Sequence, residues 1–205
     1  MNERNWLARL ASEKKPLPLL SFPGIRFLGD VNVRQMVCDS GLQARCMKAV
    51  ADRVDAAAAV SFMDLSVEAE AFGARVLFFD DDVPAVCGSL ITDEDEAQAL
   101  PIPAVGAGRT EVYIDAIRMA KEKITDRPVL AGIIGPFSLA ARLLDVTEIM
   151  MDCYDEPDMV HTVLEKATAF LIEYAKAYKA AGADGIMMAE PVSGLLSPAL
   201  EEEFS

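Results

Sequence analysis

Short apolar runs alternate with longer helical patterns along this chain of 205 residues, and that alternation restricts its fold more than any other feature. The clearest apolar run is Val129–Ile134, which lies between Pro128 and Gly135, and the clearest helical pattern is Pro157–Ala181. Strands that alternate with helices form parallel sheets, because each helix carries the chain back to the start of the next strand. The sequence therefore predicts an α/β fold.

Four strands are expected, with helices between them. The expected strands are Leu17–Ser21, Val54–Ser61, Val129–Ile134 and Ile186–Ala189. The expected helices are Asn2–Ser12, Asp39–Arg53, Leu65–Phe72, a short acidic helix from Thr92, Thr110–Ile124, Ser138–Leu144, Thr147–Cys153, Pro157–Ala181 and Pro198–Phe204. Val76–Phe79 and Val83–Val86 flank three aspartates and predict an antiparallel hairpin, whereas Phe22-Pro23-Gly24 predicts a loop.

Parallel strands of this kind form either a doubly wound open sheet or an eight-stranded barrel. No GxGxxG motif follows an expected strand, so the dinucleotide-binding form of the open sheet loses its main support. A (β/α)8 barrel of the TIM type takes about 250 residues, so four strands in this length correspond to about the first half of one. We therefore expect residues 1–205 to be the N-terminal portion of a single barrel domain.

The formal net charge of −14 argues against a nucleic-acid-binding protein, because such proteins neutralise phosphates with clustered Lys and Arg. The acidic run Asp80–Asp82 would also repel an anionic membrane surface, and no apolar run is long enough to span a bilayer. The four cysteines lack CxxC spacing, which is typical of reduced thiols in a cytoplasmic protein. We expect neither nucleic acid nor membrane among its partners.

Two carboxylates directly follow expected strands and are the candidate catalytic residues. In an α/β barrel the functional residues lie at the carboxyl ends of the strands and in the loops that follow. Asp64 follows Val54–Ser61, and Glu190 follows Ile186–Ala189. Asp64 is equally suited to cap the helix that starts at Leu65, and Glu190 to bind neighbouring loop amides, so both alternatives stay open.

Six further residues in these loops are candidate substrate-binding residues. They are Phe22, Arg26, Phe62, Met63, Phe137 and Arg142. Arg26 is suited to bind an anion or to form a salt bridge at the barrel rim. Arg142 lies among apolar residues in an expected helix, where an arginine that extends to solvent is the ordinary case. The segment Gly106–Thr110 resembles a phosphate cradle, but without Lys and Ser or Thr after the glycine it is more typical of a flexible helix entry.

His161 is the only histidine in the sequence. It shares one face of an expected helix with Asp158 and Glu165. A lone helical histidine is more often solvated or packed than bound to a metal. We expect no metal site within this chain.

Several segments together resemble the uroporphyrinogen decarboxylase superfamily. They are Phe22–Gly24, Asp39–Ala44, Ala56–Asp64 with Glu68–Gly73, Gly135–Leu139, and Gly182–Gly185 with Ala189–Pro191. The resemblance spans nearly the whole chain in order and implies the TIM-type barrel that the strand count suggests.

The resemblance to the decarboxylase branch is incomplete at the residues that bind its substrate. In that branch two arginines after the first strand grip the acidic groups of the tetrapyrrole; Arg26 matches the second, and the first falls at Phe22. The branch's substrate-site tyrosine falls at Arg142, whereas its essential aspartate matches Asp64. Loss of one bidentate guanidinium contact weakens the binding of a polyanion, which disfavours this branch.

The sequence instead resembles the methylcobamide:coenzyme M methyltransferases and their relatives. This resemblance implies transfer of a methyl group from a corrinoid protein to a small thiol or pterin acceptor, with zinc activating the thiol. The branch's zinc ligands are a His-x-Cys pair and a later Cys, which this sequence lacks and which we expect beyond Ser205. A tetrapyrrole decarboxylase and a stand-alone half-barrel that serves as a binding or scaffold module remain the alternatives. The uncovered strand edges of a half-barrel predict self-association.

Overall fold

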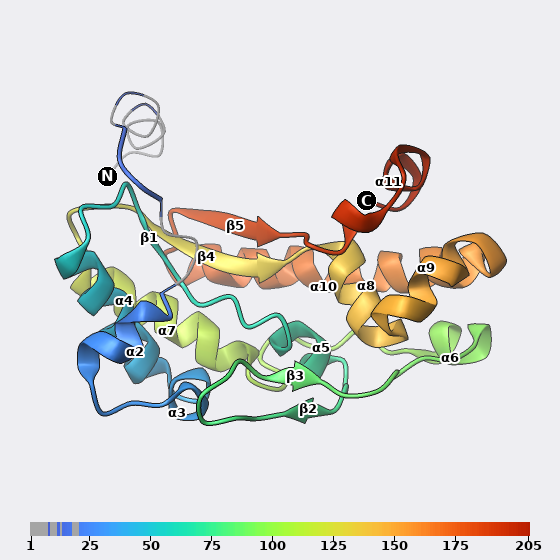
Figure 1. Cartoon of the computed structure of the whole chain (residues 1–205), viewed down its shortest axis with the longest axis horizontal. Coiled ribbons are helices and arrows are strands. Elements are labelled where there is room, and N and C mark those ends of the chain that lie inside the picture. Colours follow the sequence, from blue (N-terminus) through green and yellow to red (C-terminus); the bar gives the residue numbers. More distant parts are fainter. Residues whose placement is uncertain (1–7, 9–11, 13, 18–20) are drawn as a thin grey trace.

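A parallel sheet of three strands organises the molecule, in the order β1-β4-β5. The computed structural model describes residues 8, 12, 14–17 and 21–205. The strands are β1 (Ala59–Val60), β4 (Val129–Ile134) and β5 (Gly185–Ala189). Figure 1 shows β4 and β5 side by side, with their arrows pointing toward α8 and α11. The predicted parallel arrangement is confirmed for these strands, whereas the expected elements Asn2–Ser12 and Leu17–Ser21 lie largely outside the described residues.

β4 is the central strand, and all of its residues are buried. Its side chains alternate between the two faces of the sheet, as a strand requires. Ala131 and Ile133 belong to the large core shared with the helices, whereas Leu130 packs with Val60 and Met187 in a small cluster. Burial on both faces explains why the strand is a continuous apolar run rather than an alternating one.

Helices cover one face of the sheet and continue beyond the strand ends. The helices are α2 (Pro23–Leu28), α3 (Val33–Val37), α4 (Ser40–Arg53), α5 (Val67–Ala71), α6 (Glu94–Ala99), α7 (Thr110–Lys123), α8 (Pro136–Leu144), α9 (Val146–Asp155), α10 (Pro157–Ala180), η1 (Ser193–Leu195) and α11 (Pro198–Phe204). α4 contacts β1, while α7 and α10 contact β4 (Figure 1). None of the helices in the described part of the chain is long and apolar enough to cross a membrane.

The hairpin expected around the three aspartates is confirmed. β2 (Val76–Leu77) pairs with β3 (Ala85–Val86) in the antiparallel sense. The backbone N–H of Val33, at the start of α3, donates to the Asp80 carbonyl at 2.9 Å. The hairpin is thus attached to the helical layer rather than to the parallel sheet, from which it lies apart in Figure 1.

The expected loop at Phe22-Pro23-Gly24 is wrong, because the helix α2 begins there. Pro23 occupies the first helical turn, where a missing N–H costs nothing, and Gly29 ends the helix with a φ of 87°. The expected strand Val54–Ser61 is also longer than the observed one, Ala59–Val60. Pro23 therefore marks the start of a helix and not a break in the chain's regular structure.

The outer edge of β5 has no partner strand among the residues that the structure describes. On this strand Ile186 and Met188 have exposed fractions of 38% and 51%. An open edge with apolar side chains is a surface on which another chain can add a strand. Self-association of this chain stays a prediction.

Close packing of α2 on α4 predicts that Gly24 tolerates no side chain. A Cβ at this position would lie 2.5 Å from the backbone oxygen of Cys46. We expect Gly24→Ala to lower the free energy of unfolding by about 1–3 kcal/mol, measured by urea unfolding. Gly194→Ala is the matched control, because a Cβ there meets nothing within 4 Å. Equal losses in the two variants would contradict the close contact.

Candidate active site

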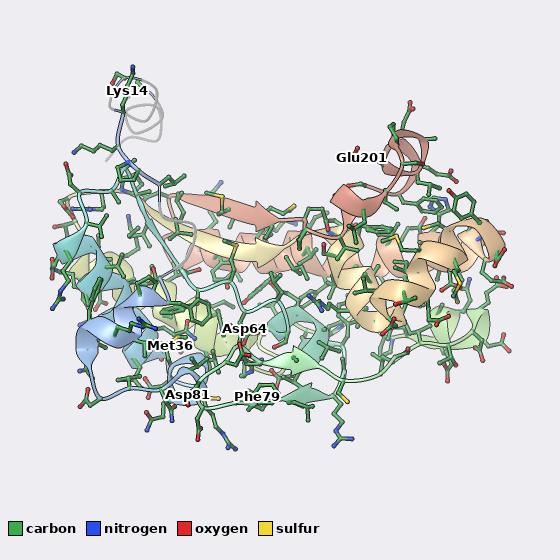
Figure 2. The ribbon with its side chains drawn as sticks, in the orientation of Figure 1. Lys14, Met36, Asp64, Phe79, Asp81 and Glu201 are labelled. Atoms are coloured by element: carbon green, nitrogen blue, oxygen red, sulfur yellow. The ribbon has the colours of Figure 1, made fainter. Side chains whose placement is uncertain are left out.

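Three candidate positions lie just beyond the carboxyl ends of the parallel strands. Asp64 follows β1, Gly135 follows β4 and Glu190 follows β5. Parallel strands end at the same edge of a sheet, so the loops after them share one side of the molecule. Figure 2 shows Asp64 between the sheet and the hairpin, which carries Phe79 and Asp81.

The Asp64 carboxylate is fully enclosed and fully hydrogen-bonded. Its side chain has an exposed fraction of 0%. Oδ1 accepts from the Ser66 backbone N–H at 3.1 Å and from the Ser66 hydroxyl at 2.6 Å, and Oδ2 accepts from the Tyr113 hydroxyl at 3.2 Å. Oδ2 also forms an ion pair with Nη1 of Arg109. The alternative of a helix cap is therefore wrong for Asp64, because Ser66 is the N-cap of α5 and Asp64 instead pairs with a buried cation.

Arg109 connects three parts of the site. Its Nε donates to Glu70 Oε2 at 2.6 Å, and its Nη2 donates to the Ser66 hydroxyl at 2.8 Å. The guanidinium also lies 4.8 Å from the ring centroid of Phe78 in the hairpin. Burial by itself lowers the pKa of Arg109, but Asp64, Tyr113 and Glu70 outweigh it and raise that pKa, so the cation is permanent. The strand end, α5 and the hairpin are thereby fixed to the start of α7.

The glycines before α7 allow this arginine to reach Asp64. Gly108 has a φ of 55°, and a Cβ there would lie 3.3 Å from the backbone N of Ala71. The Thr110 hydroxyl accepts from the Gly106 N–H at 2.9 Å and donates to the Ala107 carbonyl at 2.6 Å. The segment Gly106–Thr110, expected to be a flexible helix entry, is instead held tightly against α5.

Glu68 is a second buried acid, one turn beyond Asp64. Its Oε1 accepts from the Ile134 N–H, at the end of β4, at 3.2 Å. Burial, with a contribution from nearby Asp64, raises the pKa of Glu68 to about 7. The hydroxyls of Tyr174 and Tyr178 lie 2.7 Å apart in the same region of the core. Glu68 thus exchanges its proton near neutral pH.

A small cavity, here called the strand-end cavity, lies among these groups. It is lined by Phe62, Met63, Asp64, Leu65, Val67, Glu68, Tyr113, Gly132, Ile133, Ile134, Tyr174 and Tyr178. Its volume of about 10 Å³ is near the minimum that accommodates one water molecule. The cavity is too small for a substrate.

Glu190 binds the first amides of α8, as the alternative for this residue anticipated. Its Oε2 accepts from the Phe137 N–H at 3.1 Å, and its Oε1 accepts from the Ser138 N–H at 2.6 Å. A carboxylate at a helix N-terminus is stabilised by the unpaired N–H groups and the helix dipole. Gly135 leaves the space that this carboxylate occupies, because a Cβ there would overlap Glu190.

A much larger space, here called the hairpin hollow, lies between the hairpin and α8. It has a volume of about 820 Å³. Its lining residues are Phe22, Met63, Leu65, Ser66, Phe79, Asp82, Val83, Pro84, Ala85, Val86 and Arg142. Most of the wall is apolar, and it carries a single cation, Arg142, among the residues described.

The six candidate substrate-binding residues lie in three different places. Phe22, Met63 and Arg142 line the hairpin hollow. Phe62 and Phe137 are fully buried, and Phe62 packs edge-on against Phe22 with ring centroids 5.0 Å apart.

Neither candidate catalytic residue belongs to the wall of the hairpin hollow: Asp64 lies on the strand-end cavity and Glu190 at the start of α8. Arg26 is exposed on α2 and is also absent from that wall.

The sequence interpretation missed Arg109, Tyr113 and Glu68 as parts of the site. Arg109 is 45 positions from Asp64, so no local pattern joins them. The sequence signal for Arg109 is the pair Gly106 and Gly108 before α7. Gly108 lets the backbone approach α5 closely, whereas the sequence analysis predicts only a flexible helix entry there. Within the described ranges no three His, Cys, Asp or Glu side chains lie together as metal ligands. His161 instead stacks on Phe204 at 4.7 Å between ring centroids.

Comparison with known proteins identifies relatives of two kinds. The family model described as Uroporphyrinogen decarboxylase (URO-D) matches residues 27–205. A methylcobamide:CoM methyltransferase MtaA of Methanosarcina barkeri is 31% identical over 68% of this chain and 42% of its own length. A uroporphyrinogen decarboxylase of Coxiella burnetii is 29% identical over 87% of this chain and 49% of its own length. The chain thus spans less than half of the length of these curated relatives.

A solved structure has the same fold over the full chain. It is a methyltransferase from Methanosarcina mazei, with a TM-score of 0.86 and 25% sequence identity. The match covers 100% of this chain and 64% of that one. The likeness confirms the expected fold class, an α/β arrangement of the TIM-barrel type.

Removing the buried cation tests the role of the Asp64–Arg109 pair. Arg109→Met leaves Asp64 without its counter-charge, and we expect a loss of roughly 3–5 kcal/mol in the free energy of unfolding. Arg118→Met on the same helix breaks only an exposed pair with Asp115, so its cost should stay below about 1 kcal/mol. Adding Asp64→Asn to Arg109→Met should recover part of the loss. Similar costs for the two single variants in urea unfolding would contradict a buried pair.

The raised pKa of Glu68 predicts a stability difference that depends on pH. In the folded state Glu68 keeps its proton to about pH 7, whereas the unfolded chain loses it above about pH 4. The folded state binds more protons between these values, so the stability from this group is present below pH ~4 and is lost as the pH rises through 7. Relative to the wild type, Glu68→Gln should therefore gain up to about 3 kcal/mol between pH 4 and pH 8.

The measurement is urea unfolding of both proteins across this pH range. Exposed Glu122→Gln is the matched control and should follow the wild type at every pH. A constant difference between Glu68→Gln and the wild type would show that Glu68 does not titrate as its burial requires.

Proposed function

Because the chain belongs to the uroporphyrinogen decarboxylase family, whose members include methyltransferases and decarboxylases, we propose that it is part of a corrinoid-dependent methyltransferase. The enzyme would take a methyl group from a methylated corrinoid protein and pass it to a small thiol or pterin acceptor. The described residues would supply one wall of the acceptor site, at the carboxyl ends of β1, β4 and β5.

The observation that carries this proposal is the charge of the hairpin hollow. Its wall has one cation, Arg142, and one acid, Asp82, within a mostly apolar surface. A tetrapyrrole with acetate and propionate groups around its ring requires several cations. Phe22 stands on the wall at the position matched to the decarboxylase branch's first arginine, and Arg26 lies exposed outside it. This wall suits a small, weakly charged acceptor better than a polyanion.

The reaction needs an acceptor nucleophile, a methyl donor and an enclosed place for them to meet. The sulfur of a thiol acceptor would take the methyl group that a methylated corrinoid supplies, the electron pair of the broken bond would stay on the corrinoid, and the thiol proton would pass to water. Residues of the hollow would orient the acceptor by contact, and Asp64 with Arg109 would hold the wall in place without touching it.

A zinc ion implied by the methyltransferase branch does not fit the described residues. They contain no group of three His, Cys, Asp or Glu side chains placed to bind a metal. Asp64 is engaged by Arg109, and Glu190 by the amides of α8, so neither carboxylate offers a free ligand set. No step performed by this chain is therefore assigned to a metal.

Two assays on the full product of the gene test the proposal. With methylcobalamin and a thiol, we expect a thioether product by mass spectrometry and the matching loss of the methylcobalamin absorbance. With uroporphyrinogen under reducing conditions, we expect no coproporphyrinogen. The decarboxylase alternative requires the opposite pair of results. If this chain is itself the full product and both assays are negative while it folds stably, the binding or scaffold alternative holds.

A further inference from the structure

We propose that the exposed side of helix α9, here called the α9 face, is a docking surface for a second protein that presents Lys or Arg side chains around an apolar residue. The α9 face consists of Glu148, Met151, Tyr154 and Asp155. Docking of such a partner is independent of the reaction proposed above.

Two large apolar side chains extend from α9 into solvent. Met151 and Tyr154 have exposed fractions of 48% and 69%, whereas Ile149 and Cys153 on the same helix are buried. Residues three positions apart lie on the same side of a helix, so the two exposed side chains are neighbours. Methionine and tyrosine are enriched in protein interfaces, where contact with a partner removes their apolar surface from water.

Acidic side chains frame this apolar pair. Glu148 and Asp155 lie three positions before and four positions after Met151, so they share its side of the helix. Both are exposed, and neither forms an ion pair with any residue that the structure describes. The sequence contains no Lys or Arg between Arg142 and Lys166. Within this segment the apolar pair is therefore framed by negative charge alone.

The acids of α9 stand where they weaken their own helix. Its carboxyl end carries Asp152, Asp155 and Glu156 and no basic residue. The carboxyl end of a helix has a partial negative charge, so acids there are destabilising. Burial, together with Glu148, Glu156 and Asp155, raises the pKa of Asp152, because these carboxylates repel one another. Acids placed at a cost to stability are expected where binding a partner requires them.

Neighbouring helices extend the negative surface. α6, α9 and α11 lie around the same end of α10, on the right in Figure 1. α6 contributes Glu94–Glu96, and α11 contributes Glu201–Glu203, of which Glu201 is labelled in Figure 2. Neither of these two helices contains Lys or Arg. A surface of this breadth suits several cations that are spread over a protein rather than one small ion.

Other occupants of the α9 face are disfavoured by the same charges. Within the described ranges no three His, Cys, Asp or Glu side chains are placed together to hold a metal ion. Nucleic acid and an anionic membrane would be repelled. A second copy of this chain would bring its own formal net charge of −14 to the contact. A basic protein partner is attracted, and its association should be faster at low ionic strength.

The test is a titration of this chain with three capped pentapeptides, followed by two-dimensional NMR of ¹⁵N-labelled protein at low ionic strength. The first peptide has a leucine flanked by two lysines on each side, the second has serine in place of leucine, and the third has glutamates in place of the lysines. We expect the first to bind at least threefold more tightly than the second, with amide shifts gathered on α9 and α11. The third should not bind.

Two double variants separate the charges from the apolar pair. Asp155→Asn with Glu156→Gln should weaken both lysine peptides at least fivefold. It should also raise the Tm by about 1–4 °C, because these charges oppose the helix dipole. If the two acids served the fold alone, the Tm would fall instead. Met151→Ser with Tyr154→Ser should abolish the preference for the leucine peptide over the serine peptide.

The matched control lies on α10. Ile172→Ser with Glu173→Gln removes an equally exposed apolar side chain and an exposed acid, and this variant should bind every peptide as the wild type does. The amide spectrum of each variant reports whether the fold is kept. Should Met151→Ser with Tyr154→Ser not fold, Tyr154→Ser alone decides, because that side chain is the more exposed of the two.

Equal affinity of the wild type for the leucine and serine peptides would overturn the docking surface. Amide shifts spread over every acidic part of the chain would overturn it as well, because they would show a general attraction of cations. Shifts of the α9 amides that depend on protein concentration alone would assign this face to a second copy and reject the basic partner.

Discussion

The buried ion pair between Asp64 and Arg109 is the constraint on which the rest of the site depends. A carboxylate and a guanidinium removed from water must neutralise each other, and here each also satisfies its remaining hydrogen bonds with Ser66, Glu70 and Tyr113. The pair fixes the end of β1 to the start of α7 and, through Phe78, fixes the hairpin to both. Residues held by this attachment line both cavities: Asp64 and Tyr113 line the strand-end cavity, and Ser66 lines the hairpin hollow.

Local signals in the sequence were sufficient for most of the secondary structure. β4 matches its apolar run, Val129–Ile134, because a central parallel strand is buried on both faces. α4 begins where Asp39 was expected to cap it, and the Asp39 carboxylate accepts from the Leu42 N–H at 2.7 Å. α10 ends one residue before its predicted limit, next to Gly182 with a φ of 99°. Periodicity, caps and glycines act over a few residues, so they can be read from one sequence.

The site was predicted less well, because its contacts join distant segments. Asp64 and Glu190 were identified by their places after strands, but their partners, Arg109 and the amides of α8, lie 45 or more positions away. The resemblance to a family supplied the fold class, which the strand count alone left open. It did not supply Arg109, because a buried counter-charge is chosen by packing rather than by spacing. The error at Pro23 has a similar cause, since whether a proline ends or begins a helix depends on what the next turn packs against.

The acids near the strand ends are all engaged within the protein, and this limits what the described residues do. Asp64 and Glu190 carry negative charges that internal donors already satisfy, and Glu68, with its raised pKa, is enclosed beside a cavity of about 10 Å³. None of these groups therefore meets a ligand in the hairpin hollow. The group that faces that space with an unused charge is Arg142. These acids thus offer no free carboxylate to that space, and this chain matches less than half of the length of the curated relatives.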